Sequence, residues 1–218
     1  FGPLPVVGFN SALGFQYGAC VDIFNYGDGS RYPKFDYKMN FEASAYTKGS
    51  LNLRFYGDFY NLLPNSRLFI DAGYFTDKRF EFYGFNGYAS PYFNDIYVMD
   101  TINNGINTLQ ENFNPEFKSV FYRMKRNQFR FNSCLRRQFG FGDNIYYGIG
   151  LSYFNYDMGR IEIQNEEYSY DEQMTLFELY RESGLIRDNE ADGGNVTQLK
   201  LSFIYDTKNH DSDPTKGT

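Results

Sequence analysis

Side chains able to act together as nucleophiles, acids or bases are scarce in this 218-residue chain. His210 is its only histidine, and it lies in the polar stretch 205–218, so a Ser–His or His–Asp mechanism would need partners from outside this span. A solvated turn residue is the simpler interpretation of His210. Cys20 and Cys134 are too few for a disulfide framework and are expected as free thiols. We therefore predict no enzyme activity, no catalytic residue and no cofactor.

One acidic segment has the spacing of a calcium loop. From Asp188 to Gly193 the sequence is Asp-Asn-Glu-Ala-Asp-Gly, which matches the pattern Asp-x-acid-x-Asp-Gly. However, the third position is Glu, and Leu199 stands where a bidentate Glu would close the site. A solvated acidic loop is the favoured interpretation, and no metal ligand is assigned. Whether Asp188–Asp192 binds calcium stays open at this point.

The elements that would position any site are β-strands, because apolar and polar residues alternate with a period of two nearly everywhere. No run of 18 apolar residues occurs, which excludes a membrane-spanning helix. The alternation predicts eight strands: Val6–Asn10, Phe15–Ile23, Tyr37–Ala45, Leu51–Phe59, Arg67–Phe75, 126–136, Ile145–Tyr153 and 196–206.

Two of the predicted connections are long, at about residues 86–118 and 164–195, and the others are short turns. Helical spacing of Phe177 and Tyr180, with Gly184 as a C-terminal cap, predicts a short helix within Asp171–Arg187 in the second long loop. Long loops at one rim and short turns at the other are typical of outer-membrane barrels.

Alternation alone does not say which face of the sheet meets water. A soluble barrel or sandwich would turn its apolar residues inward, and a membrane barrel would turn them outward. Full charges in mid-strand (Glu42, Arg54, Asp71, Arg130) suit a watery lumen, and aromatic residues gather near predicted strand ends, as in interfacial girdles. The aromatic residues at these ends are Tyr26, Tyr46, Tyr60, Phe139 and Tyr156. The sequence thus favours an all-β fold, a transmembrane antiparallel β-barrel.

Basic residues are frequent around the sixth predicted strand: Arg123, Lys125, Arg126, Arg130, Arg136 and Arg137. They alternate with apolar neighbours along a sheet, so a nucleic-acid interface is a poor interpretation. The chemistry of these residues agrees better with ion pairs inside the lumen, formed with Glu42, Asp58 and Asp71, or with contacts to lipopolysaccharide phosphates near one rim.

The last predicted strand runs into a polar turn closed by Pro214 and Gly217. A reversal needs a strand to reverse into, so we expect residues 1–218 to be part of a larger sheet. With the turn as a boundary, the chain is expected to be the N-terminal half of its barrel.

Several segments resemble the barrel of the BamA/TamA superfamily of outer-membrane proteins. Residues 5–10 (Pro-Val-Val-Gly-Phe-Asn) and 13–18 (Leu-Gly-Phe-Gln-Tyr-Gly) resemble the family's short first strand and glycine-rich second strand. Residues 82–87 are similar to its Phe-aromatic-Gly-x-Gly-Asn signature, with Phe-Asn-Gly at the end here.

The closing segment carries the most specific part of the resemblance. Residues 205–209 with 214–217 look like the family's Asp-x-Arg-Asp…Pro-x-x-Gly strand and turn, with Lys208 and Asn209 where Arg and Asp are commoner. The family's Arg-Gly-Phe lid-loop motif and its periplasmic repeats do not occur in residues 1–218.

The resemblance implies a bacterial outer-membrane location, about eight of sixteen strands, and a non-enzymatic role in inserting or translocating outer-membrane proteins. Its partners would be outer-membrane lipid, lipopolysaccharide, and client barrels or complex subunits, with no nucleic acid. A first strand that separates from the last would offer its unpaired edge to incoming strands. The alternatives are a passive barrel subunit of a larger complex and the membrane anchor of a fused hydrolase domain.

Overall fold

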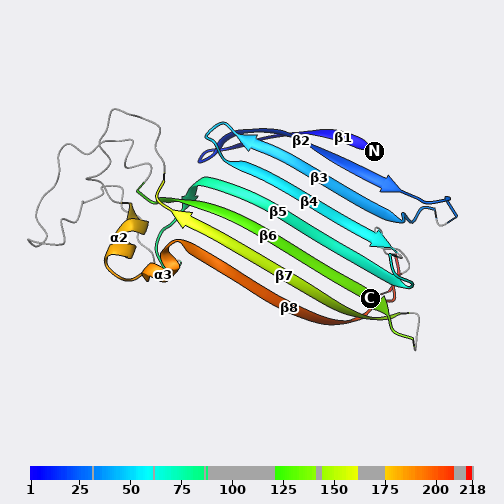
Figure 1. The fold of residues 1–218 in the computed structure, drawn as a ribbon. Helices are drawn as coiled ribbons and strands as arrows, with labels where there is room; N and C mark the ends of the chain where they lie inside the picture. Colours follow the sequence, from blue (N-terminus) through cyan, green and yellow to red (C-terminus); the bar gives the residue numbers. More distant parts are fainter. Residues whose placement is uncertain are drawn as a thin grey trace, which may run out of the picture. The chain divides into compact units, whose positions relative to one another are not determined.

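The chain forms one eight-stranded sheet in which the strands follow their order in the sequence, β1 to β8 (Figure 1). The computed structural model describes residues 1–30, 32–60, 62–85, 87, 121–140, 144–161, 175–208 and 215–217. The strands are β1 (Gly2–Asn10), β2 (Gly14–Asn25), β3 (Tyr37–Tyr46), β4 (Leu51–Tyr60), β5 (Ser66–Glu81), β6 (Arg123–Gln138), β7 (Ile145–Gly159) and β8 (Gly193–Tyr205). The mostly antiparallel, all-β fold predicted from the alternation is confirmed.

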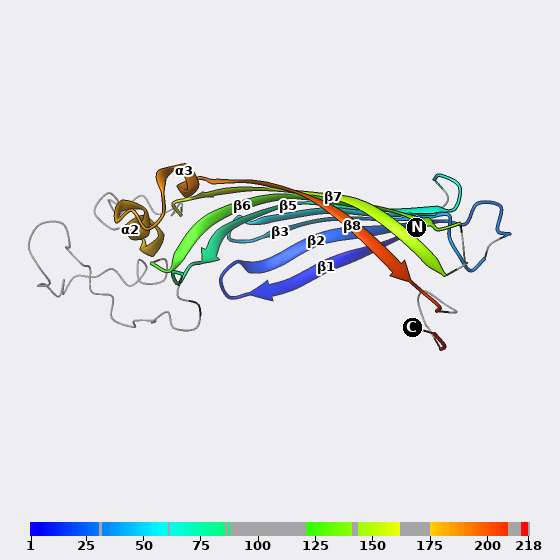
Figure 2. The same ribbon diagram turned by 90° about the horizontal axis from the view of Figure 1, so that it is seen from below.

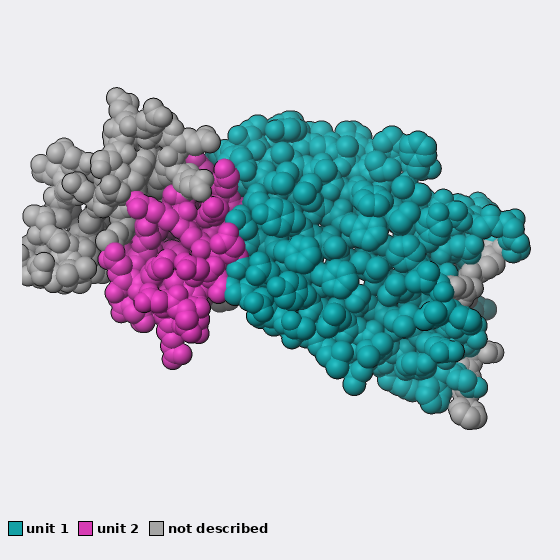
Figure 3. Space-filling model, in the orientation of Figure 1, with its two compact units in different colours: residues 1–76, 127–156, 194–218 teal, residues 77–126, 157–193 magenta. Residues whose placement is uncertain are grey.

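β1 and β8 are the two edge strands of the sheet (Figure 2). Within the described residues, neither edge strand has a second neighbour. The chain divides into two compact units, coloured teal and magenta in Figure 3. Unit 1 holds residues 1–76, 127–156 and 194–218, and unit 2 holds residues 77–126 and 157–193.

The register of unit 1 keeps residues of one kind on one face. Phe41 in β3 lies opposite Phe55 in β4, and Phe55 lies opposite Ala72 in β5. On the other face, Glu42 lies opposite Arg54. Because side chains alternate along a strand, a slip of one residue would exchange the two faces, so the pattern strongly specifies this register.

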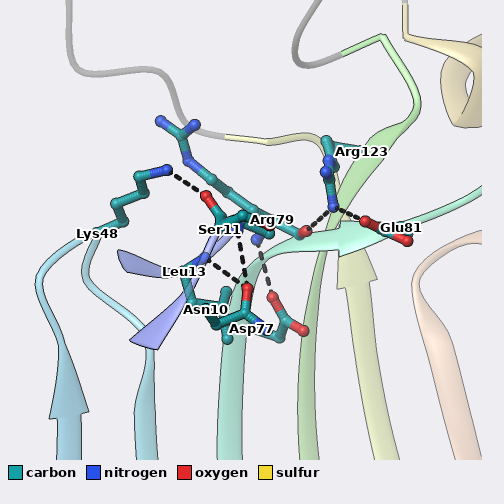
Figure 4. A network of polar contacts seen from close by, with 9 residues as sticks. Asn10, Ser11, Leu13, Lys48, Asp77, Arg79, Glu81 and Arg123 are labelled. Carbon is teal, nitrogen blue, oxygen red and sulfur yellow. Dashed lines mark hydrogen bonds and ion pairs between the residues drawn. The ribbon is translucent and has the colours of Figure 1, made fainter. Parts of the chain in front are cut away.

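Local hydrogen bonds close the short turns of unit 1. The Asn10 side-chain oxygen accepts from the backbone N–H groups of Ala12 and Leu13, and the Lys48 ammonium donates to the Ser11 carbonyl (Figure 4). In the β2–β3 connection, the Ser30 hydroxyl and N–H donate to the Asp28 carboxylate and lower the pKa of that carboxyl.

Unit 2 contains the predicted helix, α2 (Leu176–Glu182). It begins with a reciprocal capping box, in which the Thr175 hydroxyl accepts from the Glu178 N–H and the Glu178 carboxylate accepts from the Thr175 N–H. Gly184 follows with a φ of 74°, the left-handed conformation expected of a C-terminal glycine. A second short helix, α3 (Asp188–Ala191), follows.

Eight strands occur where eight were predicted, but several bounds differ. β1 is longer than Val6–Asn10, because it begins at Gly2, and β5 continues past Phe75 to Glu81. The predicted loop 164–195 overlaps the start of β8 at Gly193. Most of the predicted loop 86–118 lies outside the described residues.

The predicted arrangement, with short turns at one rim and long loops at the other, does not hold for the first four strands. The β1–β2 turn covers residues 11–13 and the β3–β4 turn covers residues 47–50, and both are shorter than the β2–β3 connection at 26–36. The short hairpins are hidden from the periodicity because the signal for a turn lies in a few local hydrogen bonds.

Candidate functional surfaces of the sheet

One face of the unit 1 sheet carries large apolar side chains that no described residue covers. They are exposed even in mid-strand, for example Phe41 at 46%, Ile149 at 48% and Leu199 at 68%. Further exposed members of this face are Val7, Phe9, Phe15, Tyr17, Leu53, Tyr74, Phe129, Tyr147, Leu151, Leu201, Phe203 and Tyr205. We call this surface the apolar face.

The interior of unit 1 is not apolar. The buried residues of its described part are glycines and polar residues: Gly14, Ser44, Ser50, Gly57, Asp58, Ser66, Gly73, Gly148, Gly150 and Ser152. None of the described buried hydrophobic residues belongs to unit 1. Unit 1 therefore buries glycines and polar residues and leaves its large apolar side chains exposed.

The opposite, polar face of unit 1 holds two ion-pair clusters. Arg54 donates to both Asp71 oxygens, at 3.2 and 3.1 Å, and Arg130 approaches the same carboxylate at 3.4 Å. Arg67 donates to both oxygens of Asp58, at 2.8 and 2.7 Å. Such forked contacts fix the orientation of the guanidinium group as well as its position.

The predicted pairing of basic residues with acids holds only in part. Arg130 does pair with Asp71, but Glu42 accepts from the Asn52 amide rather than from an arginine. Asp58 pairs with Arg67 of β5, a partner that the sequence argument did not consider. Arg136 stacks over the Phe69 ring at 4.7 Å.

The remaining basic residues of the segment lie elsewhere. In unit 2, Arg123 donates to the Glu81 carboxylate at 2.7 Å and to the Arg79 carbonyl (Figure 4). Arg126, also in unit 2, stacks over the Phe80 ring at 3.7 Å. Arg137 is exposed and one position removed from Arg136 along β6, so it faces the other side of the sheet.

Aromatic residues pair near the strand ends of unit 1. Phe35 contacts Tyr60 with ring centroids 5.3 Å apart, Tyr26 contacts Tyr32 at 5.5 Å, and Phe139 contacts Tyr147 at 6.1 Å.

Not all of the predicted girdle residues belong to the apolar face. Tyr156 accepts from Gln128 on the polar face, and Tyr60 carries the Arg67 guanidinium over its ring at 4.0 Å. Tyr60 in β4 and Tyr156 in β7 have even numbers, and the even-numbered residues of these two strands face the polar side. This follows from the alternation of side chains along a strand.

Along the free edge of β1, some residues offer a backbone N–H donor and others do not. Proline has no N–H and is tolerated in a paired strand where that group would point away from the partner. Pro3 and Pro5 both lie within the β1–β2 ladder. We infer that residues of their parity face the free edge, so Pro3 and Pro5 offer only carbonyl acceptors there, while Val7 and Phe9 offer both N–H and C=O.

The calcium-like segment is largely helical. Asp188, Glu190 and Ala191 belong to α3, Ala191 is buried, and Asp192 accepts from the Arg181 guanidinium at 3.1 Å. Across the described ranges, no group of three or more potential metal ligands comes together. Cys20 and Cys134 are free thiols, as predicted. His210 lies outside the described residues.

Sequence reasoning missed the role of Arg67. It lies on a strand whose alternation is irregular, because Phe69 and Phe75 share its face with Asp71. The structure explains this exception: Arg67 and Arg136 stack over Phe69, and Arg130 stacks over Phe75. Phenylalanines on the polar face therefore serve as platforms for guanidinium groups.

The part of the chain that the structure describes contains no helix long and apolar enough to cross a membrane. No family model, curated protein or solved structure matches the chain.

Proposed function

We propose that unit 1 is the lipid-facing wall of a transmembrane β-barrel in a bacterial outer membrane, and that the chain is the N-terminal half of a sixteen-stranded barrel of the BamA/TamA type. One observation carries the first step: the apolar side chains of unit 1 are exposed while its buried residues are glycines and polar residues. Contiguous apolar patches on soluble monomers rarely exceed a few hundred Å². The acyl chains of a bilayer would cover this apolar face and keep it out of water.

The polar face supports the same proposal. Membrane barrels alternate lipid-facing apolar residues with lumen-facing polar residues along each strand. The Arg54–Asp71–Arg130 cluster stands in mid-strand on such a face and is partly accessible to water. The Arg67–Asp58 pair lies near the β4–β5 turn, with Arg67 partly accessible and Asp58 buried. Paired charges of this kind suit a hydrated lumen better than a dry protein core.

For the barrel's activity we propose insertion or translocation of outer-membrane proteins, as the resemblance implies. The free edge of β1 is the element that would act. Val7 and Phe9 would form hydrogen bonds with an incoming strand, whereas Pro3 and Pro5 limit how firmly any strand can pair with the N-terminal part of this edge. An edge at which some residues lack a backbone N–H favours exchange of the paired strand over permanent closure of the barrel.

The lipid-facing step can be tested by fluorescence quenching, because the chain contains no tryptophan. Phe129→Trp places a reporter on the apolar face, and Gln128→Trp places it one residue away on the polar face. In bilayers of lipids brominated along their acyl chains, the Phe129→Trp emission should be strongly quenched and the Gln128→Trp emission only weakly. Equal quenching of the two variants would rule out the proposed orientation.

The activity is tested separately with the intact protein in liposomes. It should accelerate the folding of an urea-unfolded outer-membrane barrel relative to empty liposomes. Val7→Pro, which removes one more donor from the free edge, should reduce this acceleration, while Val7→Ala, which keeps the N–H, should not. If the wild-type protein gives no acceleration, the insertion role is wrong, and a passive barrel or a membrane anchor becomes the better description.

A further inference from the structure

Unit 1 contains a cavity of about 280 Å³ on its polar face, next to the β4–β5 turn. Four cationic side chains line it, those of Lys34, Arg67, Arg136 and Lys208, against one carboxylate, that of Asp206. The Asp58 carboxylate does not line the cavity but pairs with Arg67, so the excess positive charge of the cavity comes from Lys34, Arg136 and Lys208.

Two of these cations share one aromatic ring. The guanidinium carbons of Arg67 and Arg136 each lie 4.7 Å from the centroid of Phe69. Arg67 is already paired, because its Nε–H and Nη2–H groups donate to the two Asp58 oxygens. Stacking leaves the edge of the Arg136 guanidinium group, with its N–H donors, available to a ligand.

Arg136 differs from the other arginines of the polar face. Arg67 has the Asp58 carboxylate, and Arg54 and Arg130 share Asp71. Arg136 forms no ion pair with a described residue, and its Nε, like that of Arg130, is buried without a hydrogen-bond partner there. A buried donor without a partner is costly, so this group calls for an acceptor.

We propose that this cavity binds the phosphate group of a small phosphorylated molecule. Arg136 would supply forked N–H donors, and Lys34 and Lys208 would supply point charges around the remaining oxygens. A doubly charged oxyanion fits these three cations, set against the single carboxylate of Asp206, better than a single carboxylate ligand does. The volume admits a phosphate group with a small organic part and excludes a nucleic-acid strand.

The test is a calorimetric titration of the intact protein, folded in a zwitterionic detergent, with inorganic pyrophosphate. Arg136→Gln removes the unpaired guanidinium. Arg137→Gln makes the same change in charge one residue away, on the other side of the sheet, and serves as the matched control. Circular dichroism of each variant confirms that the sheet is retained.

We expect saturable binding to the wild-type protein, weakened about tenfold to hundredfold in Arg136→Gln and by less than twofold in Arg137→Gln, because a charge-assisted contact is worth about 1.5–3 kcal/mol. Lys208→Gln, at an exposed position, should weaken binding to a smaller extent, and 0.5 M NaCl should weaken it for all variants. Absence of saturable binding, or equal loss in the two arginine variants, would overturn the proposal.

The phosphate group could belong to a soluble molecule or to a lipid headgroup, and competition distinguishes the two sources. A short-chain phosphatidic acid should displace pyrophosphate strongly if the natural ligand is a lipid. Glycerol 3-phosphate should displace it as well as phosphatidic acid does if the acyl chains contribute nothing. The result does not depend on the insertion activity proposed above.

Discussion

The two units of this chain bury opposite kinds of residue. In unit 2, the buried residues include Met124, Phe177, Ile186 and Ala191, which form one apolar cluster with Phe80, Phe82, Met158 and Tyr180 packed against it. In unit 1, the buried residues are glycines and small or charged polar residues, and the large apolar ones are exposed. Both units draw on the same aromatic-rich composition.

The difference teaches that composition does not determine what a core is made of. Unit 2 excludes water by packing side chains from α2 and from strand ends, as water-soluble proteins do. Unit 1 packs its strands through backbone contact and small residues, so its stability depends on what covers the apolar face. Substitutions of one type should accordingly have different consequences in the two units.

The largest effect is expected in the apolar cluster of unit 2. Phe177→Ala removes a side chain that is 3% exposed, and should reduce the opening free energy of residues 175–192 by about 3–5 kcal/mol, because a cavity remains. Hydrogen exchange of this segment measures it. Leu185→Ala, at a side chain that is 66% exposed, is the control and should have little effect. A loss below about 1 kcal/mol for Phe177→Ala would contradict a packed core.

On the apolar face of unit 1, a charge should be harmful only in a bilayer. Leu199→Arg should destabilise the folded protein in lipid by about 2–4 kcal/mol, the cost of arginine near a bilayer midplane. Gln198→Arg, one residue away and facing the polar side, should be tolerated. Chemical unfolding in vesicles measures the free energy of unfolding of both variants. Equal losses would contradict the assignment of one face to lipid and the other to water.

The glycines of unit 1 should be sensitive where they take the place of a core residue. A Cβ on Gly18 would collide with the backbone of Ala43 and Ser44 in β3, whereas a Cβ on Gly194 would meet open space. We expect Gly18→Ala to cost about 1–3 kcal/mol and Gly194→Ala to cost little. Unfolding midpoints in detergent would show the difference, and a tolerated Gly18→Ala would mean that β2 and β3 do not approach this closely.

The smallest of these effects concerns the ion pairs of the polar face. Asp71→Asn leaves Arg54 and Arg130 without their shared carboxylate and should cost about 1–2 kcal/mol, since the site is partly accessible to water. Asp22→Asn, where the carboxylate only accepts from Asn40, is the control. The cost should shrink in high salt if it is electrostatic.

The sequence predicted the number and position of the strands well, because a period of two persists over each of them. It predicted α2 from helical spacing and a C-terminal glycine, and Gly184 has the expected left-handed conformation. It misplaced strand ends such as Gly2 and Glu81, since prolines and charged residues there obscure the alternation.

The candidate sites were less predictable. Pairing of Arg130 with Asp71 was anticipated, but the partners of Asp58 and Glu42 were not. The partner of a side chain on a sheet depends on the stagger between neighbouring strands, and alternation within one strand carries no information about stagger. The calcium-like spacing at residues 188–193 lies largely on α3, which directs its acidic residues differently from a loop.

By itself, the sequence determined that this chain forms antiparallel strands with one apolar and one polar face, because side-chain direction follows position along a strand. Only the tertiary structure decided which polar residues meet. The register of β4, β5 and β6 gathers Arg54 and Arg130 on Asp71, and it places Arg136 beside Phe69 and Arg67 in a cationic cavity. These contacts join residues far apart in the chain, and their geometry exists only once the strands are aligned.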